Sequence, residues 1–176
     1  MKRILFLFLA FPLFCQAVPV RYLFVVDTSF SMARERQTLS RAVSDIISRG
    51  LDDRMQSGEA FTIWTFNEQV YTNRFSPQIW SRDQRQPLAE RTAQFIRNQR
   101  FEKRTRIERV MPELSKVSAA PDRLRIFLFS DGDTSLAGTP FDRSINLAYA
   151  QHGRTARKAR TPLVTLLSVR GGRMVA

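Results

Sequence analysis

Three short apolar runs, separated by polar loops and amphipathic segments, dominate the pattern of hydrophobic and polar positions. They are residues 21–26 (RYLFVV), 124–129 (LRIFLF) and 163–169 (LVTLLSV), which are rich in leucine, β-branched and aromatic side chains. The first run ends abruptly at Asp27 and the second at Ser130. The sharp ends of the first two runs predict buried strands of a parallel sheet, and the third run predicts a further apolar strand.

Amphipathic segments fill the gaps between these runs. Leu39, Val43 and Ile47 recur at helical spacing, which predicts a helix that ends at Gly50. The same kind of spacing predicts further helices over residues 87–101, 107–117 and 144–157.

Residues 60–66 and 69–75 are two strand-like segments separated only by Asn67 and Glu68. This arrangement predicts a hairpin, so that one strand runs antiparallel. Strands that alternate with helices predict the α/β class, here a doubly wound, mostly parallel sheet with one antiparallel edge hairpin strand. We expect helices on both faces of the sheet and right-handed crossovers.

The composition is that of one compact domain. The chain has 176 residues, of which 43% are hydrophobic and 25% charged, and Cys15 is its one cysteine. A chain of this length buries a core without the help of disulfides. No shift in composition along the sequence indicates a second domain.

The N-terminal segment has the pattern of a secretory signal peptide. In residues 1–17, two basic residues precede an uncharged apolar run at residues 4–14, and the segment closes with Ala17. The run is too short to span a membrane, which takes roughly 20 residues. We expect cleavage after Ala17, a domain over residues 18–176 and a periplasmic or secreted protein. A lipid anchor on Cys15 is a lesser alternative.

The chain is strongly basic, with 28 Lys and Arg against 16 Asp and Glu and a formal charge of +12. Such a surface attracts acidic proteins, anionic lipid headgroups or nucleic acid. An arginine-rich codon composition explains the charge equally well. The aromatic residues do not interleave with the cations as in a base-stacking surface, so we do not expect nucleic-acid binding.

Oxygen-bearing side chains follow two of the predicted strands. Asp27, Ser29 and Ser31 come directly after the first strand, and Asp131 follows the second. In open α/β sheets, ligands bind beyond the carboxyl ends of the strands. The two strands should therefore be neighbours in the middle of the sheet. A lone aspartate there is commonly a helix cap, but three alternate oxygen ligands suit Mg²⁺, Mn²⁺ or Ca²⁺.

Residues 25–32 (VVDTSFSM) resemble the Asp-x-Ser-x-Ser-Met signature of von Willebrand factor type A domains, which opens their metal-ion-dependent adhesion site. In that family a threonine in a loop ahead of a helix and an aspartate at the end of a later strand complete the site. Thr105 in KRTRI and Asp131 in FSDG stand in those places, in the family's order. The resemblance covers about residues 20–169. It implies the family's fold and the metal ligands Asp27, Ser29, Ser31, Thr105 and Asp131.

The sequence departs from the family at three points. Phe30 stands between the two serines, where glycine is common, and Arg104 precedes Thr105, where glycine is usual. Family members also generally continue through another strand and a final helix. The end at Ala176 therefore implies a C-terminally shortened variant or an incomplete gene product.

The resemblance implies a protein-binding module that depends on a divalent cation, with Mg²⁺ favoured over Mn²⁺ and Ca²⁺. The partner would be a protein that presents an Asp or Glu carboxylate to the ion, and we expect a monomer. Arg104 and Arg106 would steer an acidic partner, or they simply belong to a solvated face. The alternatives are an accessory factor for the assembly of a periplasmic enzyme or complex, and a basic module that docks on anionic envelope surfaces without metal.

Catalysis is not expected. A serine hydrolase needs a base beside its nucleophile, and the one histidine, His152, lies in a predicted helix far along the chain from Ser29 and Ser31. An aspartyl-phosphate enzyme would need an acidic residue at the position of Ser29. Asp133, two residues after Asp131, leaves metal-assisted hydrolysis as the least favoured alternative.

Overall fold

The computed structural model describes residues 19–120 and 123–175. The expected signal peptide and its cleavage point lie outside this part of the chain. Among the residues described, no helix is both long enough and apolar enough to cross a membrane.

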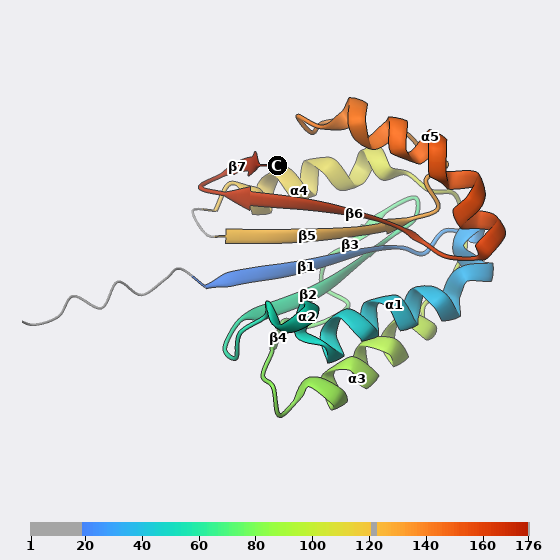
Figure 1. The fold of residues 1–176 in the computed structure, drawn as a ribbon. Helices are drawn as coiled ribbons and strands as arrows, with labels where there is room; N and C mark the ends of the chain where they lie inside the picture. Colours follow the sequence, from blue (N-terminus) through green and yellow to red (C-terminus); the bar gives the residue numbers. More distant parts are fainter. Residues whose placement is uncertain (1–18, 121–122, 176) are drawn as a thin grey trace, which may run out of the picture.

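A mixed sheet forms the centre of the described structure, with strands in the order β3-β2-β1-β5-β6-β7 and β4 also paired with β2 (Figure 1). Its middle consists of β1 (Val20–Asp27), β2 (Ala60–Phe66) and β5 (Arg123–Ser130). β1 runs parallel to both of its neighbours. Because β1 and β5 are adjacent, the carboxyl ends of the two strands predicted to carry the site meet at one edge, as expected.

The predicted hairpin is present at the edge of the sheet. β3 (Val70–Tyr71) and β4 (Gln78–Ile79) both run antiparallel to β2. The second strand is much shorter than the predicted 69–75, because the chain turns inward so that Phe75 joins the core. The Thr62 hydroxyl donates to the Phe75 carbonyl oxygen at 3.0 Å and holds this inward turn.

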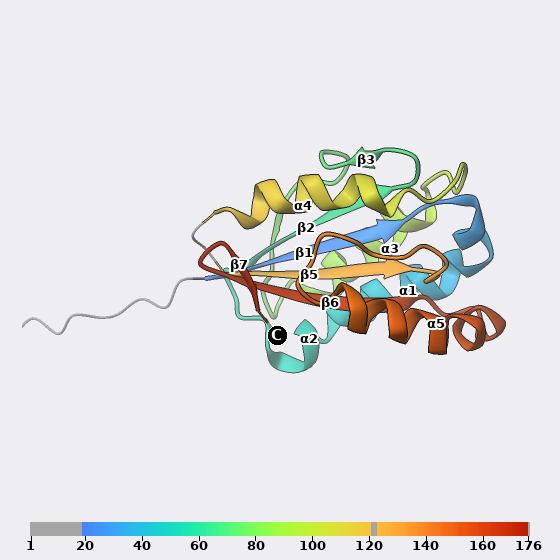
Figure 2. The ribbon, with the colours of Figure 1, turned by 90° about the horizontal axis from the view of Figure 1, so that it is seen from above.

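Beyond β5 the sheet has more antiparallel strands than the one expected. β6 (Leu163–Arg170) runs antiparallel to β5, and β7 (Arg173–Val175) runs antiparallel to β6. The expectation of a right-handed crossover to β6 was wrong. The segment after β5 returns along the sheet before α5 (Asp142–Ala159) begins, so α5 ends beside the carboxyl end of β5 and β6 starts there (Figure 2).

Helices cover both faces, which confirms the α/β class. On one face lie α1 (Arg36–Ser48), the short α2 (Gly50–Asp53) and α3 (Arg85–Arg97), and on the other lie α4 (Val110–Ser118) and α5 (Figure 1). Two short 3₁₀ turns, η1 (Phe30–Glu35) and η2 (Ile107–Arg109), lead into α1 and α4.

Alternate side chains of β1 supply both cores, as its position in the middle of the sheet requires. Phe24 and Val26 pack with the apolar faces of α1 and α3. Leu23 and Val25 pack with α4 on the opposite face. Every residue from Tyr22 to Val26 is buried, so this strand is held by apolar burial on both sides.

Gly132 directly follows Asp131 after β5, and neighbouring side chains leave no room for a side chain there. Its φ is +72°, and a Cβ there would lie 2.5 Å from Leu163 Cδ1 and 3.5 Å from Tyr149 Cγ. We expect Gly132→Ala to lower the free energy of unfolding by about 2–3 kcal/mol, from backbone strain and displacement of Leu163. Chemical denaturation measures this change.

Gly171→Ala is the matched control, because Gly171 also has a positive φ, +56°, but open space around it. It should cost about 1 kcal/mol, from backbone strain alone. Equal losses in the two variants would contradict the close packing of Leu163 against Gly132.

Candidate functional site

The carboxylate of Asp27 is the centre of the candidate site. Asp27 is fully buried at the end of β1. The Ser29 amide donates to Asp27 Oδ1 at 2.8 Å, and Thr105 Oγ1 lies 2.9 Å from Asp27 Oδ2. Both carboxylate oxygens are therefore held by donors from the protein.

Three hydroxyl groups continue from this carboxylate toward the surface. Thr105 Oγ1 lies 2.8 Å from Ser29 Oγ, and Ser29 Oγ lies 3.0 Å from Ser31 Oγ. The single hydroxyl hydrogen of Thr105 can serve either Asp27 or Ser29 at one time. Ser29 is buried, Thr105 is half-buried and Ser31 is exposed, so the row of oxygens leads from the interior to solvent.

Backbone hydrogen bonds bring Thr105 to the motif, although it lies 76 residues beyond Ser29. The Phe30 amide donates to the Lys103 carbonyl oxygen at 2.9 Å, and the Glu102 amide donates to the Thr28 carbonyl oxygen at 3.1 Å. Lys103 adopts a φ of +67°, which turns the chain between these bonds. The side chain of Arg104, directly before Thr105, is exposed and points away from the packed part of the loop.

Asp131 supplies a second buried carboxylate at the end of β5. The residue is 3% exposed, and its Oδ1 accepts a hydrogen bond from the Asp133 amide at 3.0 Å. Its Oδ2 is buried and has no hydrogen-bond partner. A buried carboxylate oxygen with no partner is costly, which makes Oδ2 of Asp131 available to a ligand.

Burial raises the pKa of Asp27 to about 6. Hydrogen bonds from Ser29 and Thr105 lower it, and the charge of Asp131 raises it further. Ionising a carboxylate away from water is unfavourable unless nearby positive charge or hydrogen bonds compensate for the lost hydration. A cation at this position would supply that compensation.

Glu35 is a third carboxylate near this group, and sequence reasoning missed it. It lies at the end of η1, is 4% exposed, and its Oε2 is buried without a hydrogen-bond partner. Burial raises its pKa to about 7; the charges of Asp131 and Asp27 raise it too, whereas Arg157 lowers it. The signal was its spacing, because Met32, Glu35 and Leu39 share one buried helical face.

The C-terminal end of α5 brings a cation to the edge of the site. Arg157 forms an ion pair with Asp133, two residues after Asp131. Because α5 ends beside the carboxyl end of β5, this guanidinium lies within electrostatic reach of Glu35.

The spacing of the oxygens is that of hydrogen-bonded hydroxyl and carboxylate groups, and it is also compatible with a small divalent cation. Six oxygens placed octahedrally at about 2.1 Å from Mg²⁺ lie about 3.0 Å from their nearest neighbours. The pairs Asp27–Thr105, Thr105–Ser29 and Ser29–Ser31 are 2.9, 2.8 and 3.0 Å apart. Within residues 19–120 and 123–175, no three His, Cys, Asp or Glu side chains form a group that could hold a metal. A cation here would therefore depend on hydroxyl ligands.

An aromatic side chain and several cations surround the opening of the site. Phe30 is 74% exposed, so its ring lies at the rim of the site. Arg104 is exposed, whereas Arg106 pairs with Glu108 at 3.4 Å and Lys103 lies 3.9 Å from Glu68.

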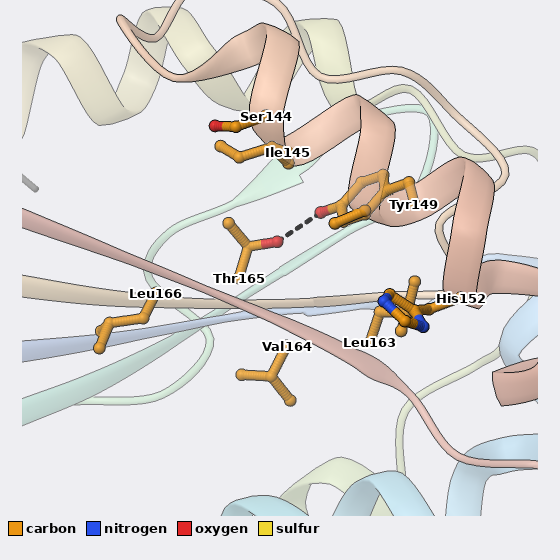
Figure 3. A pocket seen from close by; sticks show the side chains of 9 residues that line it. Ser144, Ile145, Tyr149, His152, Leu163, Val164, Thr165 and Leu166 are labelled. Carbon is orange, nitrogen blue, oxygen red and sulfur yellow. Dashed lines mark hydrogen bonds between the residues drawn. The ribbon is translucent and has the colours of Figure 1, made fainter.

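A separate apolar pocket of about 380 Å³ lies between α5 and β6 (Figure 3). Tyr149 and Thr165 close one side through a 2.6 Å hydrogen bond between their hydroxyls. His152 and Ser144 both line the pocket, but eight residues of helix separate them by about 12 Å along its axis. The Ser144 hydroxyl donates to the Phe141 carbonyl oxygen. Ser144 and His152 therefore do not form a pair of nucleophile and base.

No protein-family model matches the chain, and no curated protein matches it. Among solved structures, the human COPII-coat protein Sec24c is similar over 63% of this chain and 18% of its own, with 15% identity and a TM-score of 0.43. BatB from Bacteroides thetaiotaomicron, described as a conserved hypothetical protein, is similar over 76% of this chain and 62% of its own. Its identity is 17% and its TM-score is 0.44. The chain thus spans less than two thirds of either protein.

The raised pKa values predict how the stability of the cation-free protein depends on pH. The reference pKa is 3.8 for Asp27 and 4.5 for Glu35, and the folded values are about 6 and about 7. The folded state therefore holds protons that the unfolded state has lost. The stability from these two groups is complete below about pH 4 and is lost as pH rises to about 7.

Asp27→Asn should remove the Asp27 part of this dependence. Between pH 4 and 7, the difference in free energy of unfolding between the variant and the wild type should shift in the variant's favour by on the order of 1–3 kcal/mol. Thermal melts in EDTA across this range measure it. A difference that stays constant with pH would show that Asp27 titrates normally.

Proposed function

We propose that this protein is a binding module that uses a divalent cation to capture a carboxylate of a protein partner. The observation that carries the proposal is the meeting of Thr105 with Asp27 and Ser29 at 2.9 and 2.8 Å, from segments far apart in the chain. The unpartnered Oδ2 of Asp131 supports it.

The proposed ligands fall into two groups, charged carboxylates and neutral hydroxyls. Asp27 and Asp131 supply two negative charges against the cation, while Ser29, Ser31 and Thr105 supply neutral oxygens. When bound, the cation would attract an Asp or Glu side chain of a partner in place of a water molecule. Mg²⁺ suits the observed spacing, and Mn²⁺ and Ca²⁺ accept the same oxygen ligands.

The rim would contribute specificity and speed of association. The exposed ring of Phe30 offers an apolar contact beside the carboxylate. Arg104 would attract an acidic surface, while the pairs Arg106–Glu108 and Lys103–Glu68 reduce the net charge nearby. We propose binding without catalysis, and we place the partner in the cell envelope because of the expected signal peptide.

Cation binding should stabilise the folded protein. At a free concentration near 100 times the dissociation constant, the gain is about 2.7 kcal/mol, which corresponds to about 5–10 °C in the melting temperature of a domain of this size. Thermal melts in Mg²⁺, Mn²⁺, Ca²⁺ or EDTA measure it. Asp131→Asn should abolish the shift, because it removes the charge of the unpartnered carboxylate.

Asp142→Asn is a suitable control, since the Asp142 carboxylate accepts hydrogen bonds from the amide and hydroxyl of Thr139 in the turn before α5 and lies outside the site. It should lower the melting temperature equally with and without the cation. If none of the three cations shifts the wild-type melt, the cation-dependent function is wrong.

Partner capture should require both the cation and the serine hydroxyls. On immobilised protein, envelope proteins retained in Mg²⁺ should be released by EDTA and should not bind Ser29→Ala, which lacks one neutral ligand. Quantitative mass spectrometry of the retained proteins measures this. Ser76→Ala, at an exposed serine in the segment between β3 and β4, should behave as the wild type. Retention that EDTA leaves unchanged would favour the metal-free basic surface instead.

A further inference from the structure

Glu35 has no structural explanation in the contacts around it. The residue is 4% exposed, and its Oε2 has no hydrogen-bond partner. A buried carboxylate normally accepts hydrogen bonds or pairs with a cation, because its desolvation is otherwise uncompensated. The charges of two further carboxylates, Asp131 and Asp27, act on Glu35 and make its burial still less favourable.

Asp131 shows the same deficiency at the same place. Its Oδ2 is also buried and unpartnered, while its Oδ1 accepts the Asp133 amide at 3.0 Å. Glu35 and Asp131 thus each have a buried carboxylate oxygen that no protein group hydrogen-bonds. Their hydrogen-bond donors would therefore come from outside the polypeptide. Water molecules supply such donors at buried polar sites.

Glu35 is not placed to be a direct ligand. In the part of the chain that the structure describes, no group of three acidic, histidine or cysteine side chains could hold a metal. Glu35 instead lies at the opposite end of η1 from Ser31 and is buried where Ser31 is exposed, so it stands outside the set of proposed ligands. Carboxylates in this outer position commonly hold the inner ligands of a metal, including its water molecules.

We infer that Glu35 is a positioning residue of the cation site, which together with Asp131 accepts hydrogen bonds from water bound to the cation. This inference rests on the proposed function. It adds a third negative charge near the ion, so the protein should bind the cation firmly before any partner arrives. The water that Glu35 holds is then distinct from the one that a partner's carboxylate replaces.

Arg157 opposes this effect from the other side. Its guanidinium pairs with Asp133 and acts on Glu35, so it lessens the negative charge of the site. If Glu35 served only as a structural partner for Arg157, the two residues would have similar effects when changed. If Glu35 holds a cation-bound water, the two should have opposite effects on cation affinity.

The test is a calorimetric titration of the full chain with Mn²⁺ alone. Glu35→Gln should weaken Mn²⁺ binding by about 10- to 100-fold, as is typical for outer-shell residues. Arg157→Gln should strengthen it, and Glu90→Gln, an exposed site on α3, should leave it unchanged. Thermal melts in EDTA establish that each variant folds.

Water-proton relaxation of bound Mn²⁺ provides a second readout that a structural role would not move. Glu35→Gln should speed the exchange of Mn²⁺-bound water, because the hydrogen bond that this water donates to residue 35 becomes weaker. Wild-type affinity and exchange rate in Glu35→Gln would overturn the inference and leave the cation site intact. No Mn²⁺ binding by the wild type would overturn the proposed function as well.

Discussion

The burial of the Asp27 carboxylate at the end of the central strand is the constraint on which the site depends. Apolar packing on both faces of β1 fixes this end of the strand inside the protein. The carboxylate is therefore withdrawn from water and needs compensation from its surroundings. The turn to Ser29 and the approach of Thr105 both supply it.

The same constraint explains why three distant segments meet. The parallel pairing of β1 with β5 places Asp131 beside Asp27, and the bonds from Phe30 and Glu102 draw in the loop that carries Thr105. The result is a small acidic centre in a strongly basic chain, with a formal charge of +12 overall. Such a contrast fits the proposal of a cation inside the site and an acidic partner outside it.

Much of the fold follows from apolar patterning in the sequence. The central strands, the main helices and the edge hairpin were predictable, because burial on one or both faces leaves a clear period. The direction of β6 was not predictable. It depends on the path of the loop after Asp131, where hydrogen bonds such as Leu136 N–H to Asn146 Oδ1 decide where α5 begins. Local periodicity carries no information on such a path.

The site was predictable to a similar degree. Asp27, Ser29, Ser31 and Asp131 were predicted from their places after two buried strands, whereas Thr105 came from the resemblance alone. The structure brings all five to the same edge of the sheet. Their role as ligands stays a prediction. Glu35 escaped notice because a glutamate at the start of a helix is ordinarily solvated, and only its position on the face with Met32 and Leu39 marks it as buried.

The most direct test of the account is an anomalous-difference map from a crystal of this protein grown with Mn²⁺. A cation held by the proposed ligands should give one strong peak within about 2.5 Å of Ser29 Oγ and Ser31 Oγ, beside the carboxylates of Asp27 and Asp131. A map with no peak there at millimolar Mn²⁺, in crystals where the site is free of neighbouring molecules, would contradict it.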